Sequence, residues 1–401
     1  MLITKRDVAV REPVDPAVPP ASAVRNRLSR PARAFIVALL PVKRRGLVVA
    51  LVSWAVACGE VARENAATRG EGGDDSASTE AGKAGTPPPP SCEAGGAGMT
   101  NCSPSGSESC CTSLKVTGGT YFRSYDDVTF KDKSFPATVS DFRLDKFEIT
   151  VGRFRQFVSA VVEGWRPTAG SGKHTHLNSG NGLIATNGGY ETGWNSADWN
   201  SLLATTSDVW TTELDLDCNV GPGTWTASAG SNENLPITCM TWQEAYAFCI
   251  WDGGFLPSEA EWNYAAAGGG GTSGQRVYPW SSPSTSTTID CLYANNVGCP
   301  ADAANNVGSE SPKGDGAYGQ SDLAGNVLEW NLDWYDNYVN LCKDCANLTD
   351  PELVSESGPS RIIRGSGYYN GTAADGLASD RGASPPAFRI VDNGARCARA
   401  P

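Results

Sequence analysis

The sequence predicts an α+β domain with a high content of coil. The chain of 401 residues contains 45 Gly and 25 Pro, which is typical of a fold with many turns and loops. Three segments combine a helix-capping residue with apolar side chains at helical spacing. The other apolar segments are short and are separated by Gly, Asn, Asp and Pro, which indicates strands joined by turns.

The globular region begins with strands and a helix. Residues 116–122 predict a strand, a turn and the start of a second strand, and residues 142–150 alternate toward another strand. Thr150 is a good N-cap, so we expect a helix after it. The apolar residues that follow lie on one helical face, namely Val151, Phe154, Phe157 and Val158.

Two further helices are predicted by the spacing of a capping box, in which Ser or Thr is followed three residues later by Glu. The first begins after Thr241 with Glu244 at the third position, and the second begins after Ser258 with Glu261. We expect large aromatic residues near these helices and the later strands to fill the core. These residues are Trp242, Trp262, Trp280 and Trp330.

The net charge and the number of histidines argue against some classes of function. The chain has 32 Lys and Arg against 44 Asp and Glu, a net charge of −12. This balance argues against a nucleic-acid partner, because such binding needs cations that displace phosphate counterions. The two histidines, His174 and His176, cannot build a three-His metal centre. They are flanked by Gly and Ser, so we expect them in an exposed loop. Thirteen cysteines favour an oxidising compartment.

The first part of the chain predicts export. Lys43-Arg44-Arg45 is followed by the apolar run 46–57 and by Cys58, an arrangement typical of a secretory signal. Residues 55–58, Ala-Val-Ala-Cys, resemble the bacterial lipobox, in which the cysteine receives the lipid. We therefore expect residues 1–57 to be an N-terminal extension and signal peptide, and the protein to be a cell-envelope lipoprotein of the outer membrane or cell surface. The alternatives are an ordinary signal peptide or a buried strand.

Three segments follow the expected lipidation site. Residues 58–91 are acidic and rich in Gly, Ser and Pro, and predict a disordered tether. Residues 92–111 form a Cys-rich segment, and residues 112–401 form the globular domain. The only expected contact with a membrane is through the lipid, and we expect a monomer.

Several blocks of the globular domain, taken together and in order, resemble the formylglycine-generating enzyme or sulfatase-modifying factor family. The resemblance implies the variant of the C-type lectin fold that this family has. The blocks are 236–251 (PITCMTWQEAYAFCIW), 256–265 (LPSEAEWNYA), 278–280 (YPW), 322–330 (DLAGNVLEW), 333–335 (DWY), 364–367 (RGSG) and 389–396 (RIVDNGAR).

The resemblance also implies an activity, and the sequence departs from it. Members of the family oxidise a substrate cysteine to formylglycine, with Cu(I) held by two cysteines that follow the arginine-glycine block. Here those two positions hold Asn370 and Asp375, and no cysteine lies between Cys345 and Cys397. Copper is therefore not expected, because Cu(I) needs soft thiolates. We expect a degenerate cleft at Asn370, Asp375 and Arg381.

Calcium is the cofactor that the resemblance does support. In the family, the positions that match Asp322, Gly325, Val327 and Glu329 bind structural calcium, and such a mixed set of oxygens suits this ion. The alternative is a carboxylate pair on a solvated turn. Asn295 and Asn296 resemble the first half of a second family site, whose other half is shortened here.

The resemblance pairs Cys249 with Cys397. Spacing alone suggests three local pairs and leaves two bridges among the first four cysteines of the domain. The local pairs are Cys218 with Cys239, Cys291 with Cys299, and Cys342 with Cys345; the first four cysteines are Cys92, Cys102, Cys110 and Cys111. The Cys-x-x-Cys pair has two alternatives, a redox-active pair or half of a zinc site, and we favour a structural bridge. The thirteenth cysteine is Cys58, which would carry lipid.

Three functions remain open. The favoured one is a catalytically degenerate binding or structural module that holds a peptide, protein or glycan in the envelope. The second is a formylglycine-generating oxidase with divergent residues. The third is another oxidative activity on the same scaffold, directed at a small molecule.

Overall fold

The computed structural model describes residues 88–93, 102–186, 188–270, 274–296, 298–300, 302–338, 340–349, 351, 358–369 and 371–401. Contacts divide the chain into two units, Met1–Thr86 and Pro87–Pro401, and only the second contains described residues. The expected signal peptide, Cys58, most of the expected tether and Asn370 therefore lie outside the described residues. Within the described ranges, no helix is both long and apolar enough to cross a membrane.

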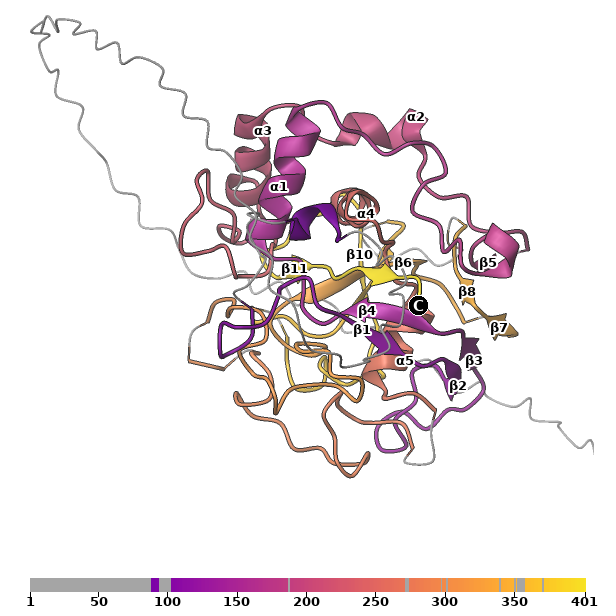
Figure 1. Ribbon diagram of the computed structural model, residues 1–401. Helices are drawn as coiled ribbons and strands as arrows, with labels where there is room; N and C mark the ends of the chain where they lie inside the picture. The colour runs from indigo at the N-terminus through magenta and orange to yellow at the C-terminus, as the bar shows by residue number, and fades with distance from the viewer. Residues whose placement is uncertain are drawn as a thin grey trace, which may run out of the picture. The chain divides into compact units, whose positions relative to one another are not determined.

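The three predicted helices are present and begin where their caps predict. They are α1 (Val151–Val162), α4 (Trp242–Trp251) and α5 (Glu259–Ala266). Thr150 accepts a hydrogen bond from the backbone of Arg153, and both capping boxes are complete. Helix α1 packs against α4 and against a short helix that was not predicted (Figure 1). The short helices are α2 (Ser196–Trp199) and α3 (Ser207–Thr211), and α3 continues into a π-helical turn, η4 (Thr212–Leu216).

Short strands form several small sheets. The first has the order β1-β4-β12 and the second β10-β9-β6-β11. The third has the order β2-β3-β7, and β5 pairs with β8. The bounds are β1 Ser113–Val116, β2 Gly119–Phe122, β3 Pro136–Val139, β4 Phe142–Asp145, β5 Ile184–Ala185, β6 Leu328–Trp334, β7 Cys342–Lys343, β8 Cys345–Ala346, β9 Arg361–Arg364, β10 Gly382–Ser384, β11 Asn393–Gly394 and β12 Ala398–Arg399.

Strand positions agree with the predictions. The segment 116–122 contains the end of β1 and the whole of β2, which belong to different sheets. The predicted strand 142–150 stops as β4 at Asp145, and its remaining residues lead irregularly to the N-cap of α1. Both ends of the domain meet at β4, because β1 and β12 pair with its two edges.

The predicted tryptophans are buried in the core. Trp242, Trp262 and Trp330 are each at most 1% exposed, and Trp280 is 9% exposed. Phe154 of α1 stacks on Phe248 of α4 with ring centroids 5.7 Å apart, which is the aromatic contact at the centre of the helical layer. In Figure 1 the long loops between α5 and β6, drawn in orange, lie on the other side of the sheets from α1 and α3.

Every predicted disulfide pair is joined in the structure. The long-range bridge links Cys249 of α4 to Cys397, 148 residues later, and the shortest links Cys342 to Cys345. Chain entropy makes a long loop more stabilising, so the first bridge contributes about 5 kcal/mol and the shortest about 2 kcal/mol. The remaining pairs are Cys218–Cys239, Cys291–Cys299, Cys92–Cys111 and Cys102–Cys110.

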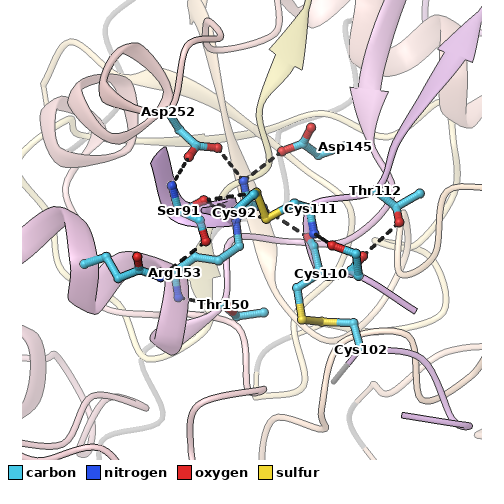
Figure 2. Close-up of a disulfide and its surroundings, with 12 residues drawn as sticks. Ser91, Cys92, Cys102, Cys110, Cys111, Thr112, Asp145, Thr150, Arg153 and Asp252 are labelled. Carbon is cyan, nitrogen blue, oxygen red and sulfur yellow. Dashed lines mark hydrogen bonds and ion pairs between the residues drawn. A yellow bond between two sulfur atoms is a disulfide. The ribbon is translucent and has the colours of Figure 1, made fainter. Parts of the chain in front are cut away.

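The Cys-rich segment packs on a buried cluster of charges (Figure 2). Arg153 of α1 donates to Asp252 at 2.6 Å and to Asp145 at 3.3 Å, and all three side chains are fully buried. Ser91 closes the cluster, since its hydroxyl accepts from Arg153 Nε at 3.0 Å and its backbone N–H donates to Asp252. Arg399 of β12 supplies the second positive charge, so two cations face two carboxylates. Ser91 thus belongs to the folded unit, and the exact boundaries at 92 and 112 stay predictions.

Candidate functional site

The predicted cleft lies in the loop that follows β9. A side chain at Gly367 would collide with Asp392, so this position tolerates only glycine. The Tyr368 hydroxyl donates to Val391 O at 3.0 Å, and the Tyr278 hydroxyl donates to Ala373 O at 2.9 Å. Two tyrosine hydrogen bonds therefore join this loop to neighbouring segments.

Asp375, which the resemblance places at one of the two thiol positions, is hydrogen-bonded within this loop. Its Oδ2 accepts hydrogen bonds from the backbone N–H and from the hydroxyl of Thr372, both at 2.7 Å. An acidic side chain that accepts from the backbone N–H three residues before it has the geometry of the third residue in a capping box. The carboxylate at this position closes a turn.

Arg381 is engaged in a different, buried cluster. Its Nε lies 2.7 Å from Glu259 Oε1, and Arg364 Nη2 lies 2.6 Å from the same oxygen. Burial alone would raise the pKa of Glu259, but the two guanidinium groups outweigh it and hold the pKa at about 2. Arg381 therefore neutralises a buried carboxylate, and the two described residues of the predicted cleft, Asp375 and Arg381, serve separate local structures.

A small hollow lies beside this cluster, large enough for about one water molecule. Tyr338 stands between two guanidinium groups, with Arg123 4.5 Å and Arg381 4.1 Å from its ring centroid. Asp333 also faces the hollow, and burial together with the charge of Glu259 raises its pKa to about 7. Sequence reasoning missed this group. The block 333–335 was the available signal, but its partners come from distant segments.

The two segments predicted to bind calcium do meet. The backbone N–H of Asn326 donates to Asn295 O at 2.8 Å, and Gly325 approaches the Asn295 backbone so closely that a side chain there would clash. Both carboxylate oxygens of Glu329, however, already accept hydrogen bonds. Arg396 donates to both oxygens at 2.6–2.9 Å, and Trp262 Nε1 donates to Oε2 at 2.8 Å.

Carboxylates that were not predicted gather around Asp322. Glu148 accepts from Asn326 Nδ2 at 2.9 Å, and burial and the charge of Asp322 raise its pKa well above the usual value. Burial and the nearby Glu310 raise the pKa of Asp322 to about 7. Glu310 Oε2 and Asn296 Oδ1 are buried oxygens without a hydrogen-bond partner. Such uncompensated hard oxygens fit a calcium ion.

The geometry of a closed metal site is nevertheless not formed by these side chains. Among the described residues, no group of three or more His, Cys, Asp or Glu side chains is arranged to hold a metal ion. A copper site fits still less, because every cysteine in the described ranges is in a disulfide. Soft thiolate ligands are therefore absent from this part of the chain.

The expectation of an exposed histidine loop is wrong for His174. Its ring nitrogens lie 3.0 Å from Glu191 and 3.0 Å from Glu261, and the side chain is fully buried. Burial lowers the pKa of His174, but the two carboxylates outweigh it and raise the pKa to about 10. His174 is a buried cation that ties its loop to the N-terminus of α5.

The chain belongs to the family of the sulfatase-modifying factor enzyme 1-like domain, which matches residues 99–401. The fold is accordingly α+β with high coil content, in the formylglycine-generating-enzyme variant of the C-type lectin fold.

Individual relatives agree with this family. The formylglycine-generating enzyme of Thermomonospora curvata is 31% identical over 158 residues, which cover 37% of this chain and 48% of that protein. The inactive C-alpha-formylglycine-generating enzyme 2 of Bos taurus is 31% identical over 168 residues, which cover 40% and 46%. The chain thus spans less than half the length of these two relatives.

Among solved structures, Treponema denticola variable protein 1 superposes with a TM-score of 0.45 at 18% identity, covering 72% of this chain and 95% of that one. PvdO from Pseudomonas aeruginosa gives 0.44 at 17% identity, covering 72% and 94%.

Proposed function

We propose that this protein is a catalytically degenerate member of its family that acts as a binding or structural module. The observation that supports the proposal is that the cysteines are oxidised. Every cysteine in the described ranges is in a disulfide, and Asp375, at a thiol position, caps its own turn. The family's oxidation has no thiolates to hold Cu(I).

The similarity to proteins named inactive formylglycine-generating enzyme 2, in Bos taurus and Mus musculus, supports this proposal. Proteins that are named as inactive therefore occur among the relatives of this chain. We further propose that the protein is exported, carries lipid on Cys58, and holds a peptide, protein or glycan in the envelope.

Calcium is part of the proposal. The amide oxygens of Asn295 and Asn296, the backbone around Gly325 and Val327, and the carboxylate of Asp322 would hold it. When bound, the ion would supply positive charge where buried carboxylates now raise one another's pKa. Glu329 would not bind the ion directly, because its carboxylate already pairs with Arg396.

The test is a competition titration of the full chain with Cu(I) against a chromogenic chelator. The formylglycine-generating enzyme of Thermomonospora curvata is the positive control. With all described disulfides intact, we expect no retention of Cu(I) by this protein, whereas stoichiometric retention would favour the oxidase alternative. A glycan and peptide array with and without Ca²⁺ then tests binding, and an array without any calcium-dependent ligand would contradict a calcium-dependent binding module.

A further inference from the structure

The Cys342–Cys345 disulfide lies in the link between two small sheets. Cys342 pairs in register with Ala137 of β3, and Cys345 pairs with Ile184 of β5. Only Lys343 and Asp344 lie between the two cysteines. The bridge therefore spans the point where the chain passes from one sheet to the other.

This link is already held without the disulfide. The Asp344 N–H donates to Thr138 O, and Asp344 O accepts from the Ile184 N–H, both at 2.8 Å. The Asp344 carboxylate accepts from the backbone of Ser140 at 2.6 Å and from its hydroxyl at 2.8 Å. A bridge around two residues also restricts the unfolded chain least among the disulfides of this protein. The cross-link thus contributes less to stability than any other described bridge, about 2 kcal/mol.

The surroundings of the bridge are chemically unusual. Cys345 lines the small hollow together with Asp333, Glu259 and Arg381. Asp333 Oδ1 accepts from the Asn347 N–H at 2.8 Å, two residues after Cys345, and its Oδ2 accepts from the Glu259 N–H at 2.7 Å. Asp333, held by these two hydrogen bonds, and Cys345 therefore line the same hollow. Glu259 raises the proton affinity of this carboxyl and Arg381 lowers it.

The residues on either side of Cys342 are exposed. Leu341, which precedes Cys342, is 94% exposed, and Lys343, which follows it, is also exposed. The exposed ammonium of Lys343, next to Cys342 in the sequence, would favour the thiolate form of an attacking thiol. Cys342 and Cys345 are themselves 5% and 4% exposed, so only a slim reagent reaches the bridge.

We propose that Cys342–Cys345 is a redox-active site that exchanges with a dithiol, with Asp333 as its proton carrier. One thiolate of the dithiol attacks Cys342 Sγ, the bond between the protein sulfurs breaks, and Cys345 leaves with the electron pair and takes a proton from Asp333. The second thiol of the dithiol then attacks the mixed disulfide and releases Cys342. The protein pair gains two electrons and two protons, and the dithiol becomes a disulfide.

This site is independent of the proposed binding function, so either can fail alone. The test places the full chain, without denaturant, in mixtures of oxidised and reduced dithiothreitol. Acid quenching, alkylation and mass spectrometry then report each disulfide separately. We expect Cys342–Cys345 to become reduced at a ratio at least tenfold less reducing than Cys102–Cys110 or Cys291–Cys299, with an unchanged circular dichroism spectrum and full reoxidation.

Two variants examine the mechanism. In the native protein, the rate of reoxidation should rise through about pH 7, where Asp333 becomes a proton acceptor. In Asp333→Asn this rise should move toward the pKa of a free thiol, about 8.5. Lys343→Gln, an exposed change that spares the fold, should slow the exchange severalfold. Reduction of Cys342–Cys345 no earlier than the two control pairs, or only together with unfolding, would overturn the proposal.

Discussion

His174 Nε2 lies 3.0 Å from Glu261 Oε2, and this contact joins the loop after α1 to the capping box of α5. Glu191 holds the other ring nitrogen, so one imidazolium is shared by two buried carboxylates. These two ion pairs fix the loop that contains His174 to the N-terminus of α5.

This contact predicts a pH dependence of stability. The folded pKa of His174 is about 10 and lies above the unfolded value of 6.5. The contribution is therefore fully present below about pH 6.5 and is lost as the pH rises through about 10. Urea unfolding at pH 6.5 and pH 9.5 should show a fall in stability that is smaller in His174→Gln. Equal falls in the two proteins would contradict the assignment.

The two described members of the predicted cleft should differ in their effect on stability. Arg381→Met leaves a buried carboxylate with one partner fewer, and breaking such a pair costs about 3–5 kcal/mol. Asp375→Ala removes only a local turn contact on a half-buried side chain and should cost about 1 kcal/mol. Chemical denaturation of the two variants measures this difference, and similar costs would mean that Arg381 is not part of a buried ion pair.

The disulfides offer a matched comparison. Replacing Cys249 and Cys397 by Ser should lower stability by about 2–5 kcal/mol, because the two cysteines of this bridge are 148 residues apart. Replacing Cys342 and Cys345 by Ser should cost about 2 kcal/mol or less. Thermal unfolding of the two double variants provides the test. A larger loss for the second pair would argue that its bridge is a needed staple.

Calcium should stabilise the fold. An ion that binds only the native state raises the melting temperature with its concentration. We expect a rise on adding Ca²⁺ and its loss in Asp322→Ala. In calcium-free buffer, Glu148→Gln should be nearly neutral, because the pKa of Glu148 is raised well above its usual value by burial and Asp322. A melting temperature of the native protein that does not change with Ca²⁺ would contradict the proposed calcium site.

Local signals in the sequence predicted local features well. The caps at Thr150, Thr241 and Ser258 placed three helices, because capping depends on residues three or four positions apart. The short disulfides followed from spacing for the same reason. The family resemblance supplied the one distant pair, Cys249 with Cys397.

Long-range charge pairing could not be predicted. His174 finds Glu261 87 residues away, and Arg381 finds Glu259 122 residues away. The neighbouring residues in the sequence predict that each of these side chains is exposed. Each is buried only because the fold brings an opposite charge to it. Glu148 and Glu310 were missed beside the predicted calcium segment because they come from other loops.

The central claim is that the family's oxidation has been lost. The most direct measurement incubates the Cu(I)-treated full chain with oxygen and a peptide containing Cys-x-Pro-x-Arg, and follows the peptide by mass spectrometry and oxygen by electrode. The Thermomonospora curvata enzyme is the control that should convert the peptide. We predict an unmodified cysteine and no oxygen uptake above buffer. Catalytic conversion of that cysteine to formylglycine would contradict the account.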